Sequence, residues 1–269
     1  MIKLKILVDN CVDQPDVQGE LGFSIYIEYD GFKVLFDVGQ SDLFARNAEL
    51  FQIDISSIDA LVVSHGHYDH TGGLPRFLEL NKKAKVYIKG GLEFDKYNAC
   101  GKYIGIPTNV SMSSNRLVNV TEKLELAQGL YIMPSINLYD KSDTHFDHLF
   151  VSNELYDTRA DQFFDEQYLA LVHNGKMSII NGCAHRGIVN IIRSALVEFS
   201  MPIQLLVGGF HTRHCNEDFI SQLAHNLNQF SIDKIVTCHC TGMDQFAQLQ
   251  RSCKTKVEYG FVGKSIIIE

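Results

Sequence analysis

Three histidines and an aspartate stand close together in the segment SHGHYDHTGG, residues 64–73. The four side chains are His65, His67, Asp69 and His70. Neutral imidazole and carboxylate are ligand types that zinc, iron and manganese accept in proteins. Packing alone does not account for four such side chains in one turn, because histidine and aspartate are not common core residues. The segment therefore predicts a metal-binding turn.

Three further histidines stand where later predicted strands end. His185 closes the segment NGCAH, His211 closes GGFH, and His239 is the central residue of CHC. In open α/β sheets, ligands bind at the carboxyl ends of the strands. We therefore expect these histidines to supply further ligands to a metal site. Two metal ions about 3.5–4 Å apart would form a clamp for an in-line displacement.

Apolar periodicity predicts the elements that position these residues. In the first part, strands are predicted over residues 2–8, 23–29, 32–38, 58–63 and 85–89, and helices over 41–51 and 74–80. In the second part, strands over 168–172, 177–180, 203–207 and 232–237 alternate with helices over 187–199, 218–230 and 243–249. The pairs Asp30-Gly31 and Asn174-Gly175 are strong hairpin signals. The whole pattern is that of an α/β protein.

Residues 136–167 are polar and aromatic, and they show no clear period. A loop of this length is often functional, so we expect an irregular, lid-like insertion. His145 and His148, with the nearby Asp143 and Asp147, are predicted to form its solvated surface, with substrate contact as the alternative. The acidic residues Asp161, Asp165 and Glu166 are also expected to be solvated.

Composition restricts the class of protein. The 269 residues carry a formal charge of −8, which argues against a nucleic-acid footprint but permits a small anionic substrate. The opening segment MIKLKILVDN is not typical of a signal peptide, and no apolar run is long enough for a membrane span.

The seven cysteines include no C-x-x-C pair, so reduced thiols in a cytoplasmic protein are expected. Cys238 and Cys240 are predicted to alternate away from His239 on one strand and to pack in the core. The oligomeric state is left open, a homo-oligomer included.

The segment HGHYDH matches the H-x-H-x-D-H motif, and through it the chain resembles the metallo-β-lactamase superfamily. The segments LFDVGQS, VVSHGHYDHTGGL, NGCAHRGIVNI and GGFH are similar to one branch, the dihydropterin–aminobenzene ribofuranosyl phosphate synthases of the methanopterin pathway. The resemblance covers most of the chain. It implies a single domain over residues 1–269 with a four-layer αβ/βα sandwich, in which two mixed sheets are flanked by helices.

The resemblance also implies two metal sites, with zinc expected and iron or manganese as alternatives. The first would be held by His65, His67 and His185, and the second by Asp69, His70 and His239. Asp37 would orient a ligand histidine by accepting its other ring proton, or else it is a turn aspartate. Many hydrolase branches have a bridging aspartate where this chain has GGFH. His211 is then a metal ligand, a residue facing the substrate, or the sign of a weak second site.

Three functions compete at this point. The first is a hydrolase of a small anionic, phosphorylated substrate, in which a metal-bound hydroxide is the nucleophile and Asp69 orients it. The predicted helix after Gly187 would offer backbone N–H groups to the anion, with Arg186 beside it and His211 as a donor. The second is the condensation of a dihydropterin with an aminobenzene ribofuranosyl phosphate. The third is a metal-binding protein without hydrolytic turnover.

Overall fold

The chain forms two units, and each is built on a large mixed β-sheet. The computed structural model describes residues 1–90, 94–110, 115–153 and 157–269. The first unit comprises Met1–Thr121, Phe146–Asp165 and Phe261–Glu269, and the second comprises Glu122–His145 and Glu166–Gly260. Within the described residues, each unit has one seven-stranded sheet, and the first unit has a further three-stranded sheet.

The large sheet of the first unit has the strand order β17-β1-β2-β3-β4-β5-β7. The strands are β1 (Ile2–Val8), β2 (Ser24–Tyr29), β3 (Phe32–Phe36), β4 (Ala60–Val62), β5 (Lys85–Ile88), β7 (Leu117–Asn119) and β17 (Ser265–Ile268). Strands β17 to β3 pair antiparallel, and β3 to β7 pair parallel. Asp30 and Gly31 both have positive φ, 48° and 87°, as the tight turn between β2 and β3 requires.

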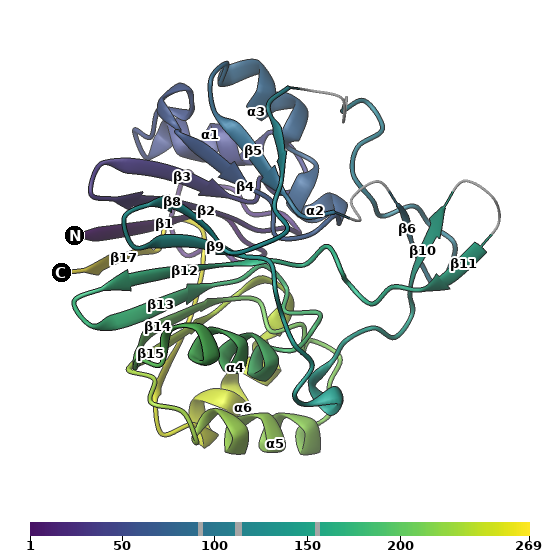
Figure 1. Cartoon of the computed structure of the whole chain (residues 1–269), viewed down its shortest axis with the longest axis vertical. Coiled ribbons are helices and arrows are strands. Elements are labelled where there is room, and N and C mark those ends of the chain that lie inside the picture. Colours follow the sequence, from purple (N-terminus) through teal and green to yellow (C-terminus); the bar gives the residue numbers. More distant parts are fainter. Residues whose placement is uncertain (91–93, 111–114, 154–156) are drawn as a thin grey trace. The chain divides into compact units, whose positions relative to one another are not determined.

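Helices accompany the parallel strands of this sheet. Residues Leu43–Leu50 form α1, Ile55–Ser57 a short 3₁₀ turn (η1), Tyr68–Thr71 α2 and Leu74–Leu80 α3. Helices α1 and α3 lie beside β3, β4 and β5 (Figure 1), and they bury Phe44 and Phe77 with Leu61 of β4 in one apolar core. The core fixes the end of β4, from which the histidine turn starts.

The junction between α2 and α3 admits no side chain. A Cβ atom at Gly72 would overlap the backbone carbonyl of Gln40, and one at Gly73 would overlap the carbonyl of Val38. The two glycines therefore let the backbone of this segment lie in direct contact with the backbone of the loop after β3.

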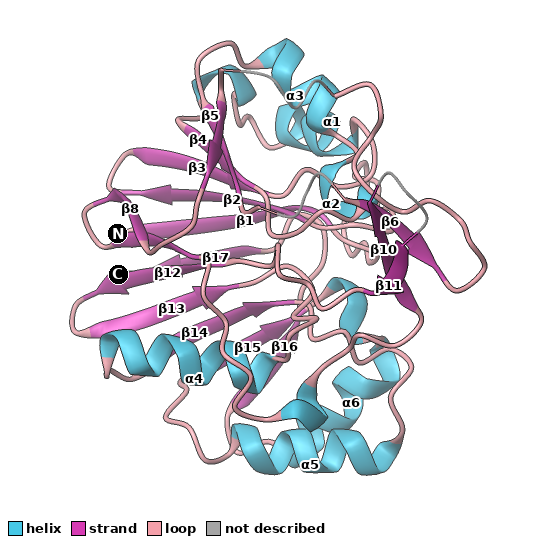
Figure 2. Cartoon of the chain, turned by 45° about the vertical axis from the view of Figure 1, so that its right-hand side comes forward, coloured by secondary structure: helices cyan, strands magenta, loops and turns pink. Residues whose placement is uncertain are grey.

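A three-stranded antiparallel sheet crosses the region predicted to be irregular (Figure 2). It consists of β6 (Asp95–Asn98), β10 (Leu149–Asn153) and β11 (Asp157–Ala160). The segment 136–167 also contains a 3₁₀ turn, η2 (Lys141–Asp143). The prediction of an irregular insertion is therefore wrong for these strands. Their periodicity is hidden because the strands are short, because β6 and β11 are polar, and because β10 pairs with β6 far away in the sequence.

The sheet of the second unit has the order β16-β15-β14-β13-β12-β9-β8. Its strands are β8 (Leu124–Ala127), β9 (Leu130–Met133), β12 (Tyr168–His173), β13 (Lys176–Ile180), β14 (Ile203–Gly208), β15 (Lys234–Thr237) and β16 (Lys256–Tyr259). Strands β13 to β16 are parallel, so their carboxyl ends meet at one edge. The helices are α4 (Ile188–Phe199), α5 (Glu217–Leu227), the 3₁₀ turn η3 (His239–Thr241) and α6 (Met243–Ser252). Ile191, Leu223 and Leu249 of the three helices share one core with the strands (Figures 1 and 2).

The predicted α/β class, with two mixed sheets flanked by helices, is confirmed. That the two units make up a single domain over residues 1–269 stays a prediction. Among the residues that the structure describes, no helix is both long and apolar enough to cross a membrane.

Candidate metal centre

The turn after β4 buries all three of its histidines. His65 and His70 have no exposed surface, and His67 is 7% exposed. Strand β4 ends at Val62, the chain bends through residues 63–66, and His67 stands in extended conformation directly before α2. Burial of three imidazoles in one turn is costly unless their ring nitrogens have polar or metal partners.

Ser64 and Asp37 fix the orientation of His65. The N–H and the hydroxyl of Ser64 donate to the two carboxylate oxygens of Asp37, each at 2.7 Å. The hydroxyl oxygen also lies 2.9 Å from Nδ1 of His65. Because a hydroxyl has a single hydrogen, which Asp37 receives, the oxygen accepts from Nδ1–H of His65. Nε2 of His65 then carries the lone pair that a metal ligand needs.

The nitrogens of His65 and His67 fit a metal ion. Nε2 of His65 lies 3.1 Å from Nδ1 of His67. Two nitrogens bound to one tetrahedral zinc at about 2.0–2.1 Å are about 3.3 Å apart. The spacing of this pair is therefore the one that a shared metal ion requires.

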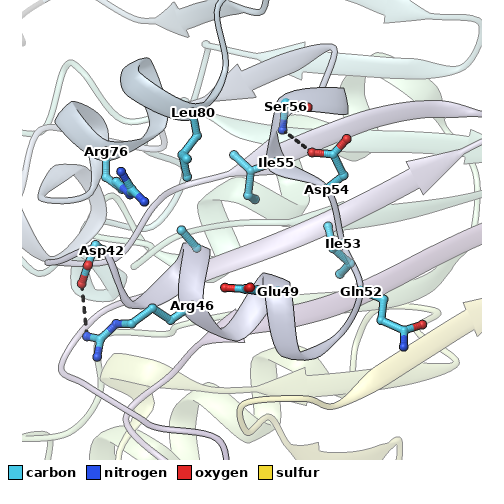
Figure 3. A pocket seen from close by; sticks show the side chains of 11 residues that line it. Asp42, Arg46, Glu49, Gln52, Ile53, Asp54, Ile55, Ser56, Arg76 and Leu80 are labelled. Atoms are coloured by element: carbon cyan, nitrogen blue, oxygen red, sulfur yellow. Dashed lines mark hydrogen bonds and ion pairs between the residues drawn. The ribbon is translucent and has the colours of Figure 1, made fainter.

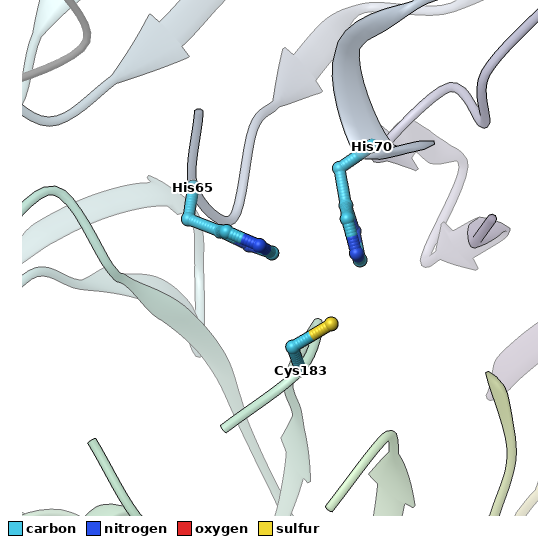
Figure 4. Close-up of side chains that lie close together, drawn as sticks. All are labelled: His65, His70 and Cys183. Carbon is cyan, nitrogen blue, oxygen red and sulfur yellow. The ribbon is translucent and has the colours of Figure 1, made fainter. Parts of the chain in front are cut away.

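Asp37 also holds His70. Its Oδ2 lies 2.7 Å from Nδ1 of His70, and both side chains are completely buried. This is the contact that the predicted orienting role of Asp37 requires, and it leaves Nε2 of His70 as the nitrogen on the side of Asp69, whose Oδ2 lies 3.9 Å away. The rings of His65 and His70 have centroids 4.3 Å apart, and Figure 4 shows them side by side.

The second unit presents its histidines at the carboxyl ends of parallel strands. His185 follows β13, His211 follows β14, and His239 follows β15. The backbone is left-handed at His211 (φ 53°), at His239 (φ 51°) and at Ala184 (φ 57°), just before His185. Non-glycine residues rarely adopt this conformation, and they concentrate at functional sites.

Glu166 fixes the backbone of the His185 turn. Its two carboxylate oxygens accept from the N–H groups of His185 and Arg186, each at 2.7 Å. Nδ1 of His185 lies 3.3 Å from the backbone oxygen of His145. This oxygen selects the tautomer in which Nδ1 is protonated and Nε2 carries the lone pair that a metal ligand would need.

His211 lies between two other imidazoles. Its ring centroid is 4.1 Å from that of His185 and 5.4 Å from that of His145. Nδ1 of His211 is buried, and it has no hydrogen-bond partner in the part of the chain that the structure describes. Burial and the nearby His211 hold the pKa of His145 down, at about 3, so His145 is neutral near pH 7. The structure thus brings His211 and His185 together.

Two cysteines belong to the same cluster: Cys183, which the sequence did not single out, and Cys240, which it assigned to the core. The ligand atoms of Cys183, His185 and His211 lie within 4.8 Å of one another, as do those of Cys183, His239 and Cys240. Cys240 is not on a strand, because β15 ends at Thr237 and η3 follows. The expected alternation into the core is therefore wrong for Cys240, although Cys238 is fully buried. A signal for Cys183 was present, since it directly precedes the Ala184-His185 turn.

The start of α4 is already capped by the chain itself. A carboxylate oxygen of Asp143 accepts from the N–H of Val189 at 2.7 Å. Arg186 is 8% exposed, and its Nε donates to the backbone oxygen of Ile136 at 3.1 Å. The N–H of Val189 and the Nε of Arg186, which were expected to face an anion, thus donate to groups of the same unit. Substrate contact by Arg186 stays a prediction.

Several acidic residues expected to be solvated are buried instead. Asp143, Asp161, Asp165 and Glu166 are 2–4% exposed. Asp147 and His148 are exposed, as expected. An acidic side chain is buried when donors surround it, and those donors come from segments that sequence periodicity does not connect.

The first unit also has a surface hollow of about 460 Å³ between α1, η1 and α3 (Figure 3). It is lined by both apolar and charged side chains, and Asp42 and Arg46 among them form an ion pair at 3.1 Å. None of the predicted site residues lines this hollow.

Comparison with known proteins gives four similarities. Residues 17–107 match the family model described as the metallo-beta-lactamase superfamily. The chain is 26% identical to the 7,8-dihydropterin-6-methyl-4-(beta-D-ribofuranosyl)-aminobenzene-5'-phosphate synthase of Methanocaldococcus jannaschii, over 93% of this chain and 90% of that protein. It is 28% identical to protein MJ0448 of the same organism, over 98% and 99% of the two chains. The chain is also similar to the crystal structure of Tm1679, described as a metal-dependent hydrolase of the beta-lactamase superfamily. The two sequences are 30% identical, the TM-score is 0.89, and the match covers 100% of both chains.

Proposed function

Because the chain belongs to the metallo-β-lactamase superfamily, we propose that it is a metal-dependent hydrolase of a small anionic, phosphorylated molecule. One observation carries the proposal. The ring nitrogens of His65 and His67 are 3.1 Å apart, which suits two ligands of one metal ion. The similarity to a structure described as a metal-dependent hydrolase supports the same reaction class.

We propose two ligand sets. His65, His67 and His185 hold the first divalent ion, and Asp69, His70 and His239 hold the second. Zinc suits these nitrogen and oxygen donors, and iron or manganese are the alternatives. When bound, such ions supply a nucleophile from water at neutral pH and polarise the electrophile.

The chain's own residues then have separate tasks. The carboxylate of Asp69 orients the nucleophile. Asp37 keeps a proton on Nδ1 of His70 through their 2.7 Å contact, so that Nε2 of His70 faces the second ion. His211 donates a hydrogen bond to the anionic group of the substrate, and its buried Nδ1 supports this role.

The second ion is expected to bind more weakly than the first. A bridging carboxylate would hold two cations together through its negative charge, which an imidazole side chain does not supply. Stepwise chelation should therefore remove the ion of Asp69, His70 and His239 first.

The condensation of a dihydropterin with an aminobenzene ribofuranosyl phosphate is the second candidate. The 26% identity to the synthase of Methanocaldococcus jannaschii over most of both chains favours it. Both candidates place a phosphorylated substrate near the metal ions, but only hydrolysis consumes water.

The test combines metal analysis with turnover. Protein purified without added metal is analysed for its metal content, and the metal-replete protein is assayed with phosphodiester, phosphomonoester, lactone and dihydropterin substrates. We expect two metal equivalents and hydrolysis of a phosphoester, both reduced in His67→Ala. Condensation without hydrolysis would select the synthase, and metal content without any turnover would select a binding protein. A replete protein with at most one ion, unaffected by His67→Ala, would refute the ligand sets.

A further inference from the structure

Lys96 of β6 is a buried ammonium group. The residue is 1% exposed, and its Nζ lies 2.5 Å from Oδ2 of Asp161 and 3.1 Å from Oδ1 of Asp165. Both aspartates are buried as well. A lysine is rarely buried in this way, because loss of hydration is repaid only by close partners of opposite charge. We therefore expect the buried ion cluster to have a structural role that a surface ion pair does not have.

Asp165 connects this ion cluster to the metal-binding turn. Its Oδ2 accepts a hydrogen bond from the N–H of Gly66 at 2.8 Å, while its Oδ1 faces Lys96. Gly66 is the residue between His65 and His67. One carboxylate thus joins the ammonium to the backbone whose course sets the spacing of the two imidazoles.

Phe163 completes the contact from the same segment. Its N–H donates to Oδ1 of Asp161 at 2.7 Å, and its backbone is left-handed, with φ 50°. The ring lies 4.7 Å from Nζ of Lys96, and its centroid is 5.2 Å from that of His67 and 6.0 Å from that of His65. The segment 161–165 therefore packs against the imidazoles and bonds to the backbone between them.

We propose that Lys96 is a positioning residue for the segment His65-Gly66-His67 and that it acts through Asp165. The inference rests on the proposed function, because it concerns the two histidines proposed to bind the first metal ion. Lys96 holds the Asp165 carboxylate, the carboxylate holds Gly66, and Gly66 holds the two histidines at metal-binding distance before the ion arrives. An ordered ligand pair loses less entropy on binding, and so the affinity is higher.

The test measures metal affinity and backbone order in the full-length protein. We expect Lys96→Met to weaken zinc binding by about 10–100-fold in competition with a chelator, the usual effect of losing a partner behind a metal ligand. The Gly66 amide should also exchange faster with solvent in the metal-free protein. Lys83→Met is the matched control, because it removes a lysine from an exposed ion pair with Asp59 in the same unit, and it should change neither quantity.

A double-mutant cycle separates positioning from general stability. If Lys96 acts through Asp165, the affinity of the Lys96→Met/Asp165→Asn protein should be no lower than that of Asp165→Asn alone. Asp165→Asn leaves Lys96 and Asp161 as a balanced pair, so it tests the inference even where Lys96→Met does not fold. In that case Asp165→Asn should by itself weaken zinc binding and speed exchange at Gly66.

The outcomes distinguish the positioning role of Lys96 from the proposed function on which it rests. Folded Lys96→Met or Asp165→Asn protein with unchanged zinc affinity and unchanged Gly66 exchange would overturn the positioning role, while zinc binding that depends on His67 would leave the proposed function standing. Additive losses of affinity in the cycle would also overturn it. A wild-type protein whose zinc binding is indifferent to His67→Ala would instead refute the proposed function.

Discussion

The carboxylate of Asp37 and the imidazole of His70 are both completely buried and meet at 2.7 Å, although 33 positions separate them in the chain. The same carboxylate receives both hydrogen bonds from Ser64, so one aspartate fixes two histidines proposed as metal ligands, one directly and one through a hydroxyl. Its backbone is left-handed, with φ 59°, which asparagine and aspartate tolerate better than most residues.

Asp37→Asn should therefore reduce metal affinity, although the asparagine side chain has nearly the same size and shape as that of aspartate. The asparagine amide would donate to Nδ1 of His70 where the carboxylate accepts, and the proton would move to Nε2, which could then no longer bind metal. We expect about 10–100-fold weaker zinc binding, measured by chelator competition. Asp42→Asn, at an exposed ion pair, is the control. An Asp37→Asn protein that binds zinc as tightly as wild type would contradict the orienting role.

His185→Ala and His239→Ala should each lower the metal content and the turnover while the sheet stays folded. Each histidine lies in the turn after a core strand of the second unit, and each is almost fully buried. Metal analysis and circular dichroism measure the two effects separately. His225→Ala, on the exposed side of α5, is the matched control. If both variants keep full occupancy and full turnover, the two histidines are core residues and not ligands.

His211→Ala should remove most turnover with little loss of metal, because His211 is proposed to be a donor to the substrate. Its left-handed backbone calls for a second variant, His211→Asn, which suits that conformation and lacks the imidazole. Both variants should behave alike in metal analysis and in turnover. Loss of one metal equivalent, with activity restored by excess metal, would show instead that His211 is a ligand.

Asp143 should make stability depend on pH. Burial raises the pKa of Asp143 to about 7, although N–H groups of Val189 and Asn190 lower it. A carboxyl whose pKa is higher in the folded state binds more protons there, so its contribution to stability is full in acid and is lost as pH rises from about 4 to about 7. The loss is on the order of a few kcal/mol.

Urea unfolding at about pH 5 and about pH 8 measures this effect. Asp143→Asn should remove the decrease, since an amide does not titrate, and Asp147→Asn, on an exposed residue, should retain it. A wild-type protein whose stability relative to Asp143→Asn is equal at both pH values would rule out the raised pKa.

Gly72→Ala should destabilise the protein or prevent its folding, because the added methyl group would overlap the carbonyl of Gln40. Gly90→Ala is the control, since a Cβ there meets only ordinary van der Waals neighbours, 3.6 Å away or more. Thermal unfolding measures both. An unchanged melting temperature for Gly72→Ala would mean that the two loops can separate without cost.

The sequence predicts those parts of the fold that local patterns determine. Asp30-Gly31 marks its hairpin, and Ile188–Phe199 shows the apolar period of a helix packed on a sheet. The sheet of β6, β10 and β11 was not predictable, because its strands are short, β6 and β11 are polar, and β10 pairs with β6 far away in the sequence. Local patterns do not report such pairings.

Prediction of the candidate site has the same limit. The H-x-H-x-D-H turn can be recognised from the sequence alone, since its spacing is unusual. Asp165 and Lys96 look like ordinary surface residues in the sequence, and their burial is explained by partners that lie far away in the chain, Lys96 by the two aspartates and Asp165 by Lys96 and the Gly66 N–H. Cys240 was assigned to a strand although the predicted strand ends at Thr237, and in the structure it lies in the 3₁₀ turn η3 instead.

The left-handed backbone at His211 has an evolutionary consequence. Aspartate is among the residues that adopt φ near 53° most readily, so the backbone at position 211 suits an aspartate as well as the histidine that stands there. The codons of histidine and aspartate differ by a single nucleotide. The two versions of this turn are thus adjacent in sequence space, and lineages can exchange them without rebuilding the loop that presents the side chain.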